Sequence, residues 1–257
     1  MTQNTSENRP SELQAGVLSA SLMLEWRRAT GRLGRIRAPQ SVILTHQMSL
    51  FQTLKPRFGR GQQQGLHCDL RLLTGRRGGL GIAGDFGIGG PATAVAVEEL
   101  ASLGVREIVA VDLAASLYAE VPSGTIVLVS DAAIGDGTAA HYRPNASAVE
   151  VSQDLSGRLA SALANRDVGF TAGRVWSTDA VYRETAAELR KYRAGDAVLV
   201  DMDSAAFLAV GAALGVETVS LLVAADTLYD DWQPPDGPRV QAALRIAARA
   251  ARESLLN

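Results

Sequence analysis

Short apolar runs alternate with amphipathic stretches along this chain, which predicts strands that alternate with helices. Residues 80–84 have the composition of a buried strand, and the glycine-rich residues 87–90 allow a tight turn. Residues 92–103 show the spacing of an amphipathic helix, which Gly104 ends as a C-terminal cap. The next apolar run, residues 107–112, completes a strand, glycine loop, helix and strand, a unit that normally contains two parallel strands.

The same alternation continues on both sides of this unit and indicates an α/β protein. The turn signal TGRRGG makes residues 66–73 and 79–85 a predicted hairpin. Residues 132–144 form a predicted loop of a length that often carries function. Other strands are predicted at residues 41–45, 124–130, 168–177, 197–202 and 219–225. Other helices are predicted at residues 13–30, 152–165, 177–192, 203–214 and 238–256.

Composition narrows the class of protein. The chain has 257 residues, 47% of them hydrophobic, so we expect a flexible arm over residues 1–9 and one domain over residues 10–257. A net charge of −2 argues against a nucleic-acid partner. No apolar run reaches membrane-spanning length and no signal peptide is visible, which indicates a soluble, cytoplasmic protein without a membrane partner. Cys68 is the only cysteine and the histidines lack metal-ligand spacing, so no metal or cofactor is expected.

Residues 87–105, GIGGPATAVAVEELASLGV, resemble the glycine loop and following helix of the nucleoside phosphorylase superfamily, especially uridine phosphorylases. The resemblance implies a three-layer α/β fold with a central twisted, mostly parallel or mixed sheet. It also implies a small-molecule substrate and a homo-oligomer, either a dimer or a hexamer, to which the N-terminal helix could contribute a contact.

The chain departs from that superfamily where phosphate binds. After the second strand of the unit, members carry an arginine and a Gly-Thr-x-Gly turn, which bind phosphate and ribose; here Ala110 and residues 112–115 occupy these places. After the first core strand, members carry a Gly-Asp-Pro loop and another arginine ligand. Here residues 45–47 read Thr-His-Gln, and no arginine follows before Arg57. The resemblance therefore implies the fold without its phosphate site.

Residues 200–204, VDMDS, resemble the Glu-Met-Glu motif of the superfamily with both glutamates shortened to aspartate. By this resemblance Met202 packs on the ribose and Asp203 accepts hydrogen bonds from the sugar hydroxyls, with Asp201 beside them in the substrate-binding set. A carboxylate suits this task because it accepts two donors and holds the sugar oriented. The alternative is that Asp203 only caps the helix that follows.

Two further aspartates are candidate catalytic groups. Asp226 keeps the spacing of an aspartate that contacts purine N7 in purine-specific members, which makes it the candidate general acid; a turn residue after a strand is the alternative. Asp112 replaces a glycine and could hold a water or a substrate cation. Clustered carboxylates repel, so we expect a raised pKa on at least one of them. The remaining substrate-binding candidates implied by the resemblance are Leu113, His141, Val181 and Tyr182.

The expected function is that of a divergent, nucleosidase-like enzyme on the phosphorylase scaffold. It would act on a nucleoside-like small molecule, by N-glycosidic hydrolysis in preference to phosphorolysis. Two alternatives stay open: a repurposed biosynthetic enzyme with a non-nucleoside substrate, and a non-catalytic binding protein. His141 could equally be a structural histidine, and His46 and His67 show no partner pattern.

Overall fold

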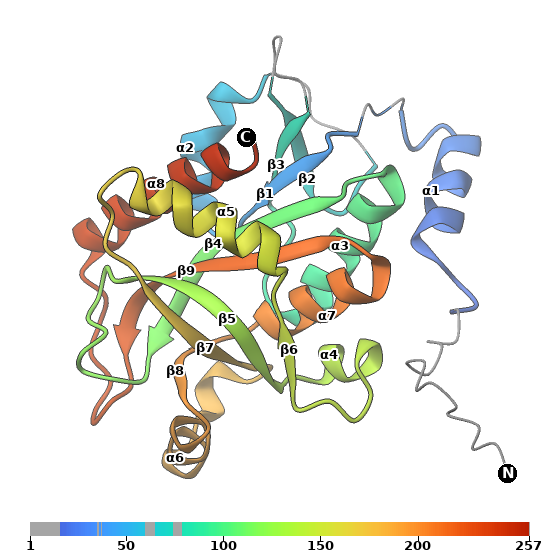
Figure 1. The fold of residues 1–257 in the computed structure, drawn as a ribbon. Helices are drawn as coiled ribbons and strands as arrows, with labels where there is room; N and C mark the ends of the chain where they lie inside the picture. The colour runs from blue at the N-terminus through green and yellow to red at the C-terminus, as the bar shows by residue number, and fades with distance from the viewer. Residues whose placement is uncertain (1–15, 35, 37, 60–64, 74–78, 257) are drawn as a thin grey trace, which may run out of the picture.

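The computed structural model describes residues 16–34, 36, 38–59, 65–73 and 79–256. The described residues form a mixed sheet covered by helices on both sides, as the alternating pattern predicted (Figure 1). The strands are β1 Ser41–Leu44, β2 Asp69–Leu72, β3 Leu80–Gly84, β4 Glu107–Ser116, β5 Ile126–Gly135, β6 Ala148–Glu150, β7 Thr171–Thr178, β8 Ala197–Asp201 and β9 Glu217–Thr227.

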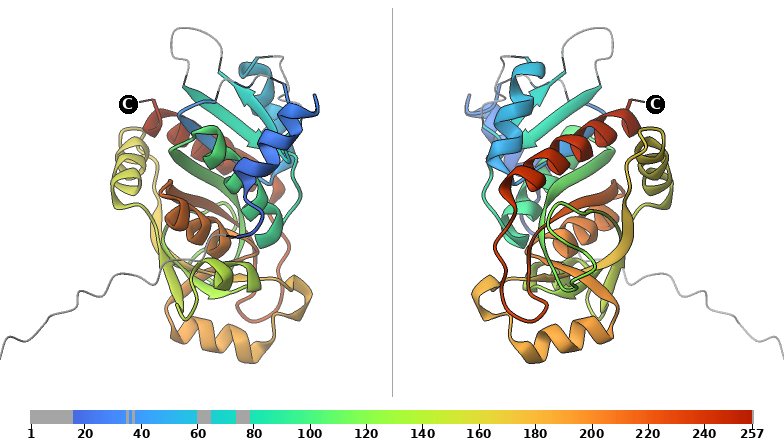
Figure 2. Two further views of the ribbon diagram at one scale, coloured as in Figure 1. Left: turned by 90° about the vertical axis from the view of Figure 1, so that its right-hand side faces the viewer. Right: turned by 90° about the vertical axis from the view of Figure 1, so that its left-hand side faces the viewer.

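The helices form two groups. One side of the sheet carries α1, α3, α4 and α7, and the other carries α2 and α8, with α5 packed against α8 (Figure 2). The α-helices are α1 Ala20–Ala29, α2 Met48–Leu54, α3 Gly90–Leu103, α4 Gly137–Tyr142, α5 Gln153–Ala164, α6 Ala186–Ala194, α7 Ser204–Leu214 and α8 Gly237–Ser254. Two 3-10 turns are η1 Lys55–Arg57 and η2 Val181–Arg183. None of the helices in the described ranges is long and apolar enough to cross a membrane.

The sheet order is β2-β3-β1-β4-β8-β7-β5-β6, and β9 pairs with both β4 and β5. These pairings close β4, β8, β7, β5 and β9 into a ring. β1 is parallel to both β3 and β4, so it lies between the two strands of the glycine-loop unit. Because β8 is antiparallel to β4, and β9 to β5, the sheet is mixed.

The glycine-loop unit has the predicted local structure. Gly89 precedes α3 with φ of 84°, and Gly104 ends the helix in the left-handed region with φ of 106°. Residues other than glycine rarely adopt these backbone angles. Pro91 lies in the first turn, where its missing N–H leaves no helical hydrogen bond unmade. The predicted hairpin is also present, since β2 and β3 pair antiparallel; its turn lies outside the described residues.

Three predicted elements are corrected. The N-terminal helix begins at Ala20 because Ser19 caps it by accepting from the Leu22 N–H at 3.3 Å; the proposed start at residues 13–15 and the arm lie outside the described residues. Residues 132–144 are not all loop, because β5 extends to Gly135 by pairing with β6 and β7, and α4 follows. The helix predicted from residue 177 begins only at Ala186, because β7 extends to Thr178 and a capping box at Thr185 starts α6.

Candidate functional site

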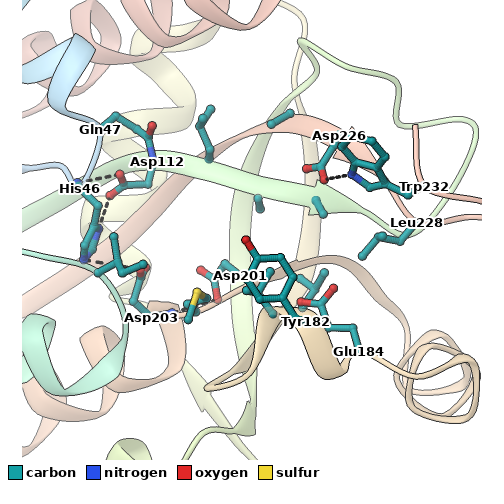
Figure 3. Close-up of a pocket in the computed structure, with 18 residues that line it drawn as sticks. His46, Gln47, Asp112, Tyr182, Glu184, Asp201, Asp203, Asp226, Leu228 and Trp232 are labelled. Atoms are coloured by element: carbon teal, nitrogen blue, oxygen red, sulfur yellow. Dashed lines mark hydrogen bonds and ion pairs between the residues drawn. The ribbon is translucent and has the colours of Figure 1, made fainter. Parts of the chain in front are cut away.

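A cavity of about 720 Å³ lies where the ends of β1, β4, β8 and β9 meet η2 and the loop after β9 (Figure 3). Most of the residues singled out in the sequence line it, although they come from separate parts of the chain. These residues are Asp112, Leu113, Val181, Tyr182, Asp201, Met202, Asp203 and Asp226. The structure therefore gathers them at one site, and their chemical roles stay predictions.

His141 is the exception, because it does not line this cavity in this chain. It lies on α4 and lines a different cavity, between α1, α3 and α7, together with Tyr142. Asp136 caps α4 by accepting from the Ala139 N–H at 2.7 Å, so the segment that carries His141 is helical and not the predicted loop.

The sequence reasoning missed four polar or aromatic lining residues: His46, Gln47, Glu184 and Trp232. A signal for His46 was available. His46 and Asp112 both stand in segments that carry phosphate ligands in the family that the chain resembles. β1 and β4 are parallel neighbours, with Leu44 opposite Ala110, so residues just beyond these positions are close in space.

Asp201 shapes the turn that presents Met202 and Asp203. Its Oδ1 accepts from the Ser177 hydroxyl at 2.6 Å and from the Asp203 N–H at 3.3 Å. Its Oδ2 accepts from the Ser204 N–H at 3.1 Å. Burial raises the pKa of Asp201 above its ordinary value, against the opposing effect of the hydrogen bonds from Ser177 and Ser204. The Asp201 side chain thus accepts from two backbone N–H groups at the start of α7 and fixes the turn.

Asp203 is therefore not merely a cap. It stands at the N-cap position of α7, but its side chain makes no capping hydrogen bond. Instead its Oδ2 lies 3.5 Å from Nε2 of His46, at the inner end of the cavity. The alternative in which this carboxyl only terminates the helix is excluded by this geometry.

His46 is the centre of a buried polar network (Figure 3). Its Nδ1 lies 2.9 Å from Asp112 Oδ2, and its backbone N–H donates to Asp112 Oδ1 at 2.8 Å. Its Nε2 lies 2.8 Å from the Thr93 hydroxyl oxygen, and that hydroxyl donates to the Gly89 carbonyl at 3.0 Å. When the single Thr93 hydrogen is donated to Gly89, Nε2 is the donor to Thr93, and Nδ1 faces the carboxyl group of Asp112. In this arrangement both ring nitrogens carry protons, and His46 is an imidazolium.

The electrostatics agree with this assignment. Burial disfavours a charged His46, but the negative charges of Asp203 and Asp112 outweigh burial and raise its pKa from 6.5 to about 9. Burial also raises the pKa of Asp203 to about 8, against the charge of His46 and with that of Asp201. The two groups cannot titrate independently. The charge on His46 therefore depends on Asp203 as well as on Asp112, and the ionised fraction of Asp203 changes near neutral pH.

A second acidic group lies toward the opposite end of the cavity, where Figure 3 shows Asp226, Trp232, Tyr182 and Glu184. The Trp232 indole N–H donates to Asp226 Oδ2 at 2.8 Å. Burial, followed by the charges of Asp226 and Glu188, raises the pKa of Glu184 to about 7. This end therefore holds a carboxyl that exchanges its proton near neutral pH.

The cavity wall is acidic. Among the residues that the structure describes, no lysine or arginine side chain lines it, whereas five carboxyl groups do. Within the same ranges, no group of three or more His, Cys, Asp or Glu side chains is arranged to hold a metal ion. The described wall can hold and exchange protons at both ends, but it presents no lysine or arginine to an anion, and its one basic side chain, His46, is paired with Asp112.

Comparisons with known proteins agree on one family. The family model described as the phosphorylase superfamily matches residues 66–256. A uridine phosphorylase of Treponema pallidum is 26% identical over 180 residues, which cover 65% of this chain and 70% of that protein. A guanosine phosphorylase of Halorubrum lacusprofundi is 25% identical over 174 residues, which cover 64% of this chain and 72% of that protein.

Solved structures show the same fold at lower identity. A purine nucleoside phosphorylase from Toxoplasma gondii, in complex with immucillin-H, superposes with a TM-score of 0.76 at 17% identity, over 87% of this chain and 94% of that chain. An AMP nucleosidase from Bacteroides thetaiotaomicron superposes with a TM-score of 0.73 at 18% identity, over 91% of this chain and 96% of that chain.

Proposed function

Because the chain belongs to the phosphorylase superfamily, we propose that it cleaves the N-glycosidic bond of a nucleoside-like small molecule, with water as the attacking group. Similar proteins include phosphorylases and a nucleosidase, so family membership leaves both chemistries open. The observation that carries the proposal is the His46–Asp112–Asp203 network at the inner end of the cavity.

The network occupies the segments in which the resemblance places phosphate ligands, and its donors are already used. Nδ1 of His46 is bound to Asp112, and Nε2 is bound to Thr93. A phosphate there would find a cation that is neutralised by Asp112 and has no N–H left to donate. An ion pair at an effective dielectric constant of 20 is worth about 4 kcal/mol at 4 Å, so breaking this pair to bind phosphate is costly.

Asp203 is suited to accept the proton that an attacking water loses. Its pKa of about 8 lies close to neutral pH, where a general base combines adequate basicity with a useful ionised fraction. His46, at 3.5 Å from Asp203, would stabilise the carboxylate form whenever that proton leaves. The same carboxyl could orient sugar hydroxyls, as the sequence motif predicted.

The leaving base needs a proton, and the outer acidic pair can supply it. Glu184, with a pKa of about 7, is partly protonated near neutral pH because burial, and after it the charge of Asp226, disfavours its carboxylate form. In the proposed reaction the water oxygen bonds to the anomeric carbon and the C–N bond breaks. The bond's electron pair goes to the base, which takes a proton from the Glu184–Asp226 pair, and Asp203 takes the water proton.

The acidic wall favours nucleosides over nucleotides as substrates. A phosphorylated substrate would bring one or two negative charges into a cavity whose described lining holds carboxyl groups and no lysine or arginine. Neutral or cationic nucleosides avoid this repulsion. We therefore expect hydrolysis of nucleosides and little or none of the corresponding monophosphates.

The test is turnover of uridine, guanosine, adenosine and AMP by the full chain, with and without millimolar phosphate. Chromatography would separate the free base, the free sugar and the sugar phosphate. We expect release of free base and free sugar from at least one nucleoside, at a rate that phosphate does not change. Asp226→Asn should lose this activity, whereas Asp230→Asn, an exposed aspartate of the same loop, should keep it. Phosphate-dependent formation of a sugar phosphate would overturn the proposal.

A further inference from the structure

Trp232 is placed in a way that core packing does not explain. The residue is 61% exposed, yet its indole N–H is directed at one carboxylate oxygen of Asp226, 2.8 Å away (Figure 3). Both residues line the cavity. A tryptophan that served only to bury apolar area would be covered, so the exposed ring and its directed hydrogen bond suggest a task at the cavity.

The loop that carries Trp232 is anchored on both sides. Thr227 and Gln233 exchange backbone hydrogen bonds of 3.1 and 3.0 Å, which close the loop next to Trp232. Arg193 of α6 donates from Nη2 to the carbonyls of Leu228 and Tyr229, both at 2.7 Å. These hydrogen bonds fix the backbone on both sides of the loop, so the Trp232 indole is attached to an ordered segment.

The chemistry of indole determines what this contact does. Indole nitrogen can only donate a hydrogen bond, so the Oδ2 oxygen of Asp226 that it contacts must act as an acceptor. A proton on Asp226 must then reside on Oδ1, the oxygen on the side away from the indole. Without the indole, the carboxyl torsion has broad, nearly twofold freedom, and either oxygen could carry the proton.

We propose that Trp232 is a positioning residue, which holds Asp226 so that only its Oδ1 can receive the proton of Glu184 and pass it to the departing base. The inference rests on the proposed hydrolysis. In this proposal Trp232 does not contact the reacting atoms and acts only through Asp226. Its contribution should therefore depend on how much the leaving group needs a proton.

The test compares Trp232→Phe, which keeps an aromatic ring without the donor, with Tyr229→Phe, a matched control in the same loop that does not line the cavity. On a nucleoside, Trp232→Phe should lower kcat about tenfold with little change in KM, the loss of about one hydrogen bond to a charged group. On nitrophenyl riboside, whose leaving group departs without a proton, the two variants and the wild type should be alike. An equal loss on both substrates would mean a merely structural role and would overturn the proposal.

A second measurement does not depend on turnover. The indole N–H resonance of Trp232, identified in proton–nitrogen spectra by its loss in Trp232→Phe, should shift and exchange faster with solvent in Asp226→Ala. An unchanged resonance would refute the contact. If no N-glycoside is hydrolysed but the resonance moves, the proposed function fails and the positioning of Asp226 by Trp232 stands.

Discussion

The buried pair of His46 and Asp112 should make the folded protein less stable as the pH rises. The pKa of His46 is raised from 6.5 to about 9 in the folded state. A raised pKa means that the folded protein holds the proton more tightly than the unfolded chain. The resulting stabilisation is fully present below pH 6.5 and is lost as the pH rises through about 9. At 1.36 kcal/mol per pKa unit, the contribution is about 3 kcal/mol. The raised pKa of Asp203 acts in the same direction.

Urea denaturation at pH 6.5 and at about pH 9 measures this directly, with Asp112→Asn as the perturbation. The Asp112→Asn variant loses the charge that stabilises the imidazolium. Its free energy of unfolding should therefore be lower than that of the wild type at pH 6.5 and approach the wild-type value at about pH 9. Asp154→Asn, which breaks an exposed pair with Arg158, should show the wild-type pH dependence with a cost of about 1 kcal/mol or less. A wild-type stability that is level or rises over this range, or an equal slope in Asp112→Asn, would refute the assignment of a charged His46.

Three further predictions concern the carboxyl groups and the assembly. Asp203→Asn and Asp226→Asn should fold normally, as measured by circular dichroism, yet their turnover should fall at least tenfold. This loss corresponds to about 1.4 kcal/mol of transition-state stabilisation. If both variants are fully active, these carboxyl groups take no part in the mechanism. If Glu184 supplies the proton, kcat/KM should fall as the pH rises through about 7, and Glu184→Gln should lose that limb of the profile. Light scattering at micromolar concentration should report a homo-oligomer, and a monomer would contradict this expectation.

The sequence correctly predicted the elements that depend on the backbone preferences of a few neighbouring residues. The loop before α3 and the cap at Gly104 follow from backbone angles that glycine alone adopts easily. The length of β5 did not follow, because residues 132–135 are held by pairing with β6 and β7, which are distant in sequence. The start of α6 was visible as a capping box at Thr185, but the prediction began the helix at residue 177, which lies in β7.

For the site too, the sequence predicted the residues of local motifs and missed those that long-range pairing brings together. Met202 and Asp203 were found from a contiguous motif and Asp226 from its spacing to that motif, and the structure brings all three to one cavity. His46 was missed because its partner Asp112 is 66 residues away, and only the pairing of β1 with β4 brings the two together. A short motif cannot report such a contact. The protonation state of His46 likewise depends on Thr93 and on burial, neither of which a linear pattern shows.

The central claim is that water, and not phosphate, attacks the sugar. The most direct measurement is single-turnover cleavage of a nucleoside in isotopically labelled water that contains millimolar phosphate, with mass spectrometry of the sugar product. The account predicts a free sugar that carries one labelled oxygen at the anomeric carbon, in the same amount whether or not phosphate is present. An unlabelled sugar phosphate, formed only when phosphate is added, would contradict it.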